Sequence, residues 1–160
     1  MKSKNIFLDK TGVAKIADFG LSTKKLLMYK VADEKVSSSQ AGDHSKVSFI
    51  KTGEGVLGTY PYIAPEIMKK QPFNELSDIF GFGWILWEIS ANKTPYHELT
   101  PEKWDEMEEK GQFYLAEIPK DCPPLFSQLI KECWNEKPND RPQSFQLISK
   151  LQHLQSKVFI

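Results

Sequence analysis

The segment from residue 79 to residue 89 constrains the fold more than any other part of the chain. It reads Ile-Phe-Gly-Phe-Gly-Trp-Ile-Leu-Trp-Glu-Ile, and its apolar residues do not keep to one stripe. A helix that is apolar all round belongs in the centre of a core. A buried strand is the alternative, but a segment of this length favours a helix. We therefore expect a central helix, with Ser77 or Asp78 capping its start.

Further helices are predicted on the C-terminal side of this segment. A helix start at Thr100-Pro101 has proline at its first position, and the helix would run to Gly111. Another begins around residues 121–124 and presents one apolar face, formed by Leu125, Phe126, Leu129, Ile130, Cys133 and Trp134. A final amphipathic helix is marked by Phe145, Ile148, Leu151 and Leu154. The expected fold is mainly α, with helices around a central apolar helix.

Composition narrows the class of protein. The chain has 160 residues, 40% of them apolar, and its 21 basic and 21 acidic side chains cancel. This balance gives no sign of a nucleic-acid surface. No apolar stretch reaches the ~18 residues of a membrane span, and the N-terminus lacks the apolar region of a secretion signal. We expect a cytoplasmic protein in which Cys122 and Cys133 are reduced, buried thiols; a disulfide or a metal pair is the alternative.

A tight β-hairpin is predicted at the N-terminus. Residues 6–8 and 13–16 are strand-like runs, separated by the turn sequence Asp-Lys-Thr-Gly. If Leu8 pairs near Val13, Asn5 pairs near Ile16 and Asp18 lies just beyond. An amide oxygen and a carboxylate side by side suit Mg²⁺ carrying the phosphates of a nucleotide. Taken alone, the pair is better explained as turn-flanking residues with no ligand.

A long polar segment follows the hairpin. Residues 21–57 show no period of 2 or 3.6, so we expect a loop, which at this length is either functional or disordered. Its candidate phosphate acceptors are Ser37, Ser38, Ser39, Ser45, Ser48 and Thr52. Phosphorylation there could order the loop, although a solvated insertion without a switch role explains the segment equally well.

Residues 58–66 come next and contain Pro61 and Pro65, which stiffen the backbone. We therefore predict that this segment is rigid, and we call it the ledge.

Several motifs, in this order, resemble the C-terminal lobe of a protein kinase. They are Asn5, Asp18-Phe19-Gly20, Gly58-Thr59-Tyr60 with Ala64-Pro65-Glu66, Asp78 at the start of the apolar helix, and Arg141. The amino-acid sequence around Asn5, Trp134 and Arg141 is similar to that of the tyrosine-kinase-like group of serine/threonine kinases. The resemblance implies a partial kinase domain over residues 1–155, an activation-type loop within it, and a tail over residues 156–160.

The resemblance also implies which residues carry the chemistry. Asp18 would bind the Mg²⁺ that bridges the ATP phosphates, and Asn5 would hold a second metal position. Lys2 would neutralise charge on the transferred phosphoryl group. Phe19 and Gly20 would complete the metal-binding motif as structural residues.

A second group of residues would shape the side that faces the protein substrate. Thr59 would contact the catalytic loop from the ledge, and Asp78 would hold the backbone of that loop. Glu66 and Arg141 would form a buried ion pair that fixes the ledge.

The chain departs from the family pattern at its start. The family's catalytic loop reads His-Arg-Asp, one further residue, then Lys-x-x-Asn, and Met1 falls on that further residue. The general base and the parts of the N-terminal lobe that hold ATP are therefore expected in sequence preceding Met1. We expect a catalytically incomplete piece of a serine/threonine kinase that phosphorylates protein hydroxyls. A non-catalytic interaction or regulatory module derived from a kinase is the alternative.

The absence of covering helices from such a lobe leads to an expectation about stability. The aromatic residues of the central segment should not all be buried, leaving exposed apolar surface there. These residues are Phe80, Phe82, Trp84 and Trp87.

Overall fold

The computed structural model describes residues 1–20, 60–69, 71–95, 106–107, 110 and 115–158. Its elements are η1 (Ser3–Asn5), β1 (Ile6–Leu8), β2 (Ala14–Ile16), α2 (Pro65–Met68), α3 (Leu76–Ala91), α5 (Pro124–Cys133), η3 (Pro138–Asp140) and α6 (Ser144–Val158). The predicted mainly-α fold with one small hairpin is confirmed for these residues. The expected loop over 21–57, Thr59 and most of the helix predicted over 100–111 lie outside them.

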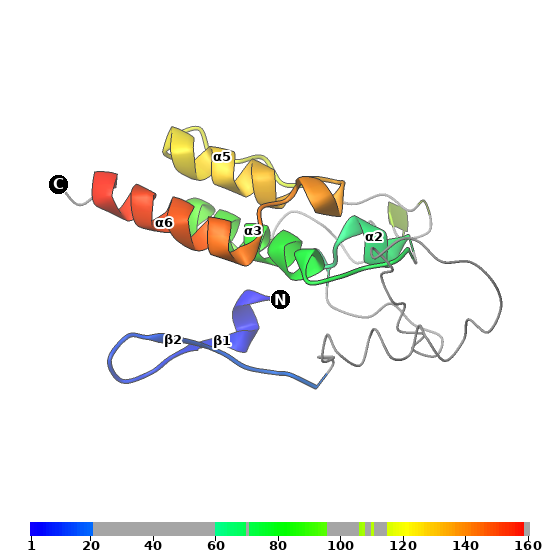
Figure 1. Cartoon of the computed structure of the whole chain (residues 1–160), viewed down its shortest axis with the longest axis horizontal. Helices are drawn as coiled ribbons and strands as arrows, with labels where there is room; N and C mark the ends of the chain where they lie inside the picture. Colours follow the sequence, from blue (N-terminus) through cyan, green and yellow to red (C-terminus); the bar gives the residue numbers. More distant parts are fainter. Residues whose placement is uncertain (21–59, 70, 96–105, 108–109, 111–114, 159–160) are drawn as a thin grey trace, which may run out of the picture.

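Helix α3 forms the centre of the core, as its all-round apolar sequence predicts. Helix α5 packs against both α3 and α6, and the N-terminal hairpin lies to one side of these helices (Figure 1). Ile6, at the start of the hairpin, packs against the core, and Met1 lies close to α3. Among the described residues, no helix is both long enough and apolar enough to cross a membrane.

The start of α3 differs from the prediction. The helix begins at Leu76, whose N–H donates to Asn74 Oδ1 at 2.9 Å. Asparagine side chains commonly bond the backbone two residues further on. The expectation that Ser77 or Asp78 caps the helix was wrong, because Asn74 takes this role from outside the helix. At its other end, α3 stops at Asn92, which adopts a left-handed φ of 49°.

The aromatic residues of α3 are better covered than expected. Phe80 and Trp84 are fully buried, Trp87 is 3% exposed, and Phe82 is partly buried against the core. Phe82 is thus not fully buried, as expected. Helix α5 and the residues after it cover much of the rest: Trp134 packs against Trp84 at an interplanar angle of 51°, with ring centroids 4.6 Å apart. Ile89 of α3 is 67% exposed, so some apolar surface of the central helix is open, and further large exposed apolar side chains lie on the hairpin at Phe7, Leu8, Val13 and Ile16.

Helices α5 and α6 bury different parts of their predicted faces. Helix α5 buries Leu129, Ile130 and Cys133 as expected. Both cysteines are free and buried, and burial raises the pKa of the Cys133 thiol to about 12.

On α6 the predicted inward residues Phe145 and Ile148 are 62% and 58% exposed, whereas Leu147 is buried. Leu147, Leu151 and Leu154 recur at i, i+4 and i+7, and these are the residues that pack against the core. The prediction was wrong for Phe145 and Ile148 because a spacing of three residues drifts around the helix, so Phe145 and Leu154 lie on opposite sides of it.

The hairpin register is shifted by one residue from the prediction. Ile6 pairs with Ile16 and Leu8 with Ala14, so Asn5 lies opposite Ala17, whose N–H donates to Asn5 O at 2.8 Å. The predicted register was wrong because the turn extends to Val13. Asp9 Oδ1 closes this turn by accepting from Thr11 N, Thr11 Oγ1 and Val13 N, at 2.7 to 2.9 Å. Asn5 and Asp18 still reach the same end of the hairpin.

Gly83 allows the close approach of α3 to the end of α5. A Cβ at this position would stand 2.7 Å from Trp134 Cδ1 and 2.9 Å from Cys133 Cβ. Both neighbours are buried, so neither can move away easily.

We expect Gly83→Ala to lower the free energy of unfolding by about 1–3 kcal/mol, because overpacking outweighs the ~1 kcal/mol gain in helix propensity. Chemical denaturation measures this change. Gly20→Ala is the control, since its Cβ would meet only Asp18 Oδ1 at an ordinary 3.6 Å. Equal midpoints for the two variants would contradict the packing argument.

Candidate functional site

Asn5 and Asp18 meet at the open end of the hairpin. Asn5 is the last residue of η1 and half-buried, while Asp18 follows β2 and is exposed. Asn5 Nδ2 donates to Asp18 Oδ2 at 3.0 Å. Asp18 has a left-handed φ of 63°, a conformation that non-glycine residues rarely adopt and that is frequent at functional sites. The structure thus brings together the two side chains that the sequence suggested as metal ligands.

The donor set of this pair fits a hard cation. The hydrogen bond leaves Asn5 Oδ1 and Asp18 Oδ1 available, and Mg²⁺ is commonly held by one or two protein oxygens together with phosphate and water oxygens. Within the described ranges, no cluster of three or more His, Cys, Asp or Glu side chains offers a closed metal cage. An open two-residue site of this kind would need further oxygen ligands to hold such a cation.

The other residues of this predicted group lie next to the pair. Lys2 precedes η1, and Asn5 N donates to Lys2 O at 3.1 Å, so both belong to one turn of backbone. Phe19 and Gly20 directly follow Asp18, and the Phe19 side chain is exposed. Thr59 lies outside the described residues.

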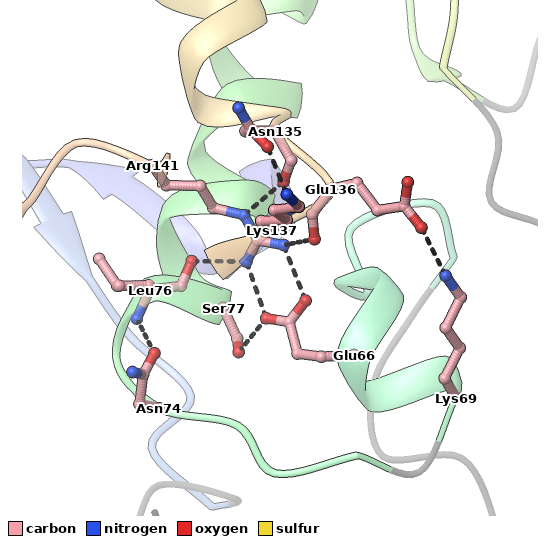
Figure 2. A network of polar contacts seen from close by, with 9 residues as sticks. All are labelled: Glu66, Lys69, Asn74, Leu76, Ser77, Asn135, Glu136, Lys137 and Arg141. Atoms are coloured by element: carbon pink, nitrogen blue, oxygen red, sulfur yellow. Dashed lines mark hydrogen bonds and ion pairs between the residues drawn. The ribbon is translucent and has the colours of Figure 1, made fainter. Parts of the chain in front are cut away.

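Glu66 and Arg141 form a buried, two-pronged ion pair at the end of the ledge. Arg141 Nη1 and Nη2 donate to Glu66 Oε1 and Oε2, both at 2.7 Å, and the two side chains are 0% and 3% exposed. Figure 2 shows that the remaining guanidinium donors reach the backbone carbonyl oxygens of Leu76, Asn135 and Glu136. All five N–H groups of Arg141 therefore have partners, as a buried guanidinium requires.

Two further contacts join this pair to the central helix. Ser77 Oγ donates to Glu66 Oε1 at 2.6 Å, and the Arg141 guanidinium carbon lies 5.1 Å from the centroid of the Phe80 ring. Asp78, one residue after Ser77, accepts from the terminal nitrogen of Met1 at 3.2 Å and is largely exposed. The first turn of α3 thus contacts both the ledge and the N-terminal segment.

Sequence reasoning missed a polar cluster at the other end of α3. Ser3 Oγ and Tyr62 Oη each donate to Glu88 Oε1 at 3.0 Å, and the two hydroxyl oxygens are 3.2 Å apart. Burial raises the pKa of Glu88 above its ordinary value of 4.5, while the two hydroxyl hydrogen bonds oppose this rise. The sequence does point to this cluster, because Glu88 is the one charged residue in the apolar segment 79–89 and would need polar partners there.

We expect Arg141→Ala to destabilise the protein by about 3–5 kcal/mol, because it leaves the Glu66 carboxylate buried without its cation. Arg141→Lys should lower the free energy of unfolding by a smaller but measurable amount, because an ammonium group cannot reproduce the two parallel hydrogen bonds of the planar guanidinium. Denaturant unfolding followed by tryptophan fluorescence gives both values.

Lys150→Ala is the matched control, since it removes an exposed 2.6 Å ion pair with Glu132 and should cost at most about 1 kcal/mol. Similar losses for Arg141→Ala and Lys150→Ala would show that the buried network does not organise the ledge.

The raised pKa of Glu88 predicts a pH dependence. The folded protein holds the Glu88 proton more tightly than the unfolded chain, so this stabilisation is complete below pH 4.5 and is lost as pH rises through the folded-state pKa. Glu88→Gln does not titrate. We therefore expect the stability of the native protein to fall relative to that of Glu88→Gln as pH rises from 4.5 towards neutrality. Thermal unfolding of both proteins across this range tests it, and a constant difference in Tm would count against it.

Comparison with known proteins assigns the family. The family model described as protein tyrosine and serine/threonine kinase matches residues 1–151. The chain is 34% identical to the dual specificity protein kinase shkC of Dictyostelium discoideum, with 96% of this chain and 27% of shkC covered. It is 28% identical to the serine/threonine/tyrosine-protein kinase HT1 of Arabidopsis thaliana, with 95% of this chain and 33% of HT1 covered.

A third relative is also named as a protein kinase. A probable LIM domain-containing serine/threonine-protein kinase of Dictyostelium discoideum is 32% identical, with 96% of this chain and 14% of the relative covered. The chain thus spans about a third or less of each of these relatives. With a family match over almost its whole length, the chain belongs to the protein tyrosine and serine/threonine kinase family.

Proposed function

We propose that this chain supplies the metal-binding and substrate-binding side of a serine/threonine protein kinase, which transfers the γ-phosphate of ATP to a hydroxyl group of a protein. The observation that carries the proposal is the contact between Asn5 and Asp18 at 3.0 Å, in a chain that belongs to the kinase family. Relatives whose names describe serine/threonine kinases support the choice of reaction.

In this proposal Asp18 and Asn5 hold the metal ions through their oxygen atoms, and Lys2 meets the transferred phosphoryl group from the same backbone turn. Bound Mg²⁺ would supply positive charge that offsets the negative charge of the nucleotide phosphates. Phe19 and Gly20 shape the backbone that follows Asp18. The hydrogen bond from Asn5 Nδ2 holds the Asp18 carboxylate in place before any metal arrives, which lowers the entropy lost on binding.

The ledge would receive the protein substrate. Glu66 and Arg141 hold its end, and Asp78 holds the N-terminal segment from α3. Thr59, which lies outside the described residues, would contact the catalytic loop. The kinase domain in this proposal occupies residues 1–155, with a tail over 156–160. It works in the cytoplasm, with further kinase segments completing the ATP site.

A second function is favoured by one observation. Four large apolar side chains of the hairpin are exposed, which suits a non-catalytic module that binds another protein segment. The two functions differ in whether the Asn5–Asp18 pair binds a nucleotide with its metal.

Calorimetry with ATP and Mg²⁺ on the 160-residue chain tests the proposal. We expect a Kd on the order of 1 mM, equivalent to about −4 kcal/mol, because only part of the nucleotide site is present. Asp18→Ala should weaken binding at least about tenfold, as expected for losing a metal ligand.

The control is Asp121→Ala, which removes an exposed aspartate outside the site. Binding that is equal in both variants, or that does not need Mg²⁺, would contradict the metal role of Asp18. Absence of nucleotide binding would favour the non-catalytic module.

A further inference from the structure

The register of the N-terminal hairpin decides whether the proposed metal ligands meet. In the observed register Asn5 lies opposite Ala17, and the next residue, Asp18, accepts from Asn5 Nδ2 at 3.0 Å. A slip of one residue would place Asn5 opposite Ile16 and move Asp18 about 3.3 Å further along the strand direction. It would also turn the side chains of β2 to the opposite face relative to those of β1. The contact between Asn5 and Asp18 therefore depends on the register.

Burial of apolar side chains does little to fix this register. All three residues of β2 are exposed, and of the three residues of β1 only Ile6 packs against the core. The register of a strand is strongly specified where one of its faces is buried, and weakly where neither face is. In a hairpin the geometry of the turn also sets the register. The turn between β1 and β2 is therefore the main source of specificity here.

The side chain of Asp9 holds this turn at one length. Asp9 O accepts from Gly12 N at 2.9 Å, and Gly12 has a left-handed φ of 81°. Three-residue hairpin loops commonly end with such a residue. Asp9 N then donates to Val13 O, and Val13 N donates to Asp9 Oδ1, both at 2.9 Å. The side chain thus accepts the Val13 N–H in place of the Asp9 carbonyl oxygen, which accepts from Gly12.

Further bonds of Asp9 hold the same arrangement. Its Oδ1 also accepts from Thr11 N at 2.9 Å and from Thr11 Oγ1 at 2.7 Å, and its Oδ2 lies 3.7 Å from Lys15 Nζ. The Thr11 hydroxyl, and then the N–H groups of Val13 and Thr11, lower the pKa of Asp9 below its ordinary value of 3.8. A four-residue loop, in which Leu8 would pair with Val13, would break the closing contacts between Asp9 and Val13.

We propose that Asp9 is a positioning residue, which sets the register of the hairpin so that Asn5 and Asp18 meet. Its place in catalysis rests on the proposed metal role of that pair. The register can be measured without nucleotide or metal, so failure of either proposal can be recognised separately.

NMR spectroscopy of the isotopically labelled 160-residue chain is the experiment. In the native protein we expect cross-strand contacts between Phe7 and Lys15, and slow exchange of the Ala17 amide hydrogen, which is bonded across the hairpin. In Asp9→Ala we expect contacts between Phe7 and Ala14 to replace those with Lys15. Exchange at Ala17 should become about tenfold faster or more, with the amides of α5 unchanged, since local openings exchange independently of the core.

Three variants separate the bonds that Asp9 makes. Asp9→Asn should keep the native contacts, because its amide oxygen accepts the same three hydrogen bonds. Thr11→Val removes one of these bonds, so exchange at Ala17 should rise by a smaller factor, and it stays informative if Asp9→Ala does not fold. Lys15→Ala is the matched control, because it removes only the exposed ion pair of Asp9 and should leave Ala17 protected.

Calorimetry with ATP and Mg²⁺ relates the register to the site. We expect Asp9→Ala to bind at least about tenfold more weakly than the native chain, as a misplaced metal ligand predicts, and Asp9→Asn to bind as the native chain does. If the register changes as expected while neither Asp9→Ala nor Asp18→Ala alters binding, the positioning role stands and the proposed metal role of Asp18 fails.

Four results would overturn the proposal. The first is native contacts between Phe7 and Lys15 in Asp9→Ala. The second is loss of these contacts with none formed between Phe7 and Ala14, which would show that Asp9 stabilises the hairpin without selecting its register. The third is faster exchange in α5 by the same factor as in the hairpin, a sign of general destabilisation. The fourth is failure of Asp9→Asn to keep the native contacts.

Discussion

The buried guanidinium of Arg141 is the interaction on which the rest of the structure depends. It connects the end of the ledge, the start of α3 and the turn after α5, through the Glu66 carboxylate and three backbone carbonyl oxygens. A charge in this position is tolerable only because every donor is used and the carboxylate is matched in geometry. Such a network contributes little net stability, but it admits one arrangement of the segments it joins.

Helix α3 gives this network its support. Its apolar surface is covered on several sides, and its two glycines let other segments approach the helix backbone. At Gly83 the neighbours are Trp134 and Cys133, and at Gly81 a Cβ would stand 2.6 Å from Met1 O. Since neither place has room for a methyl group, the distances between α3, α5 and the N-terminal segment are fixed by backbone packing.

The candidate site lies at the boundary between the buried core and the exposed N-terminal hairpin. Glu66 and Arg141 are almost inaccessible, whereas Asp18 and Phe19 are exposed at the end of a two-stranded hairpin. An isolated hairpin has little stability of its own. The orientation of Asn5 relative to the core therefore depends on the few contacts of the segment before it, which include those of Ser3 and Met1.

The sequence by itself determined the elements and their order: a central apolar helix, a hairpin that brings Asn5 and Asp18 together, and the motifs of the family. These features are local, or follow from the period of the apolar residues. The helical period also identifies the buried stripe of α6, since Leu147, Leu151 and Leu154 recur at i, i+4 and i+7. Tertiary structure decided that Asn74 bonds the first turn of α3, because Ser77 and Asp78 are engaged by Glu66 and Met1 instead. It also decided that Glu88 meets Ser3 and Tyr62, since a contact across 85 residues depends on how α3 is packed and has no local signature.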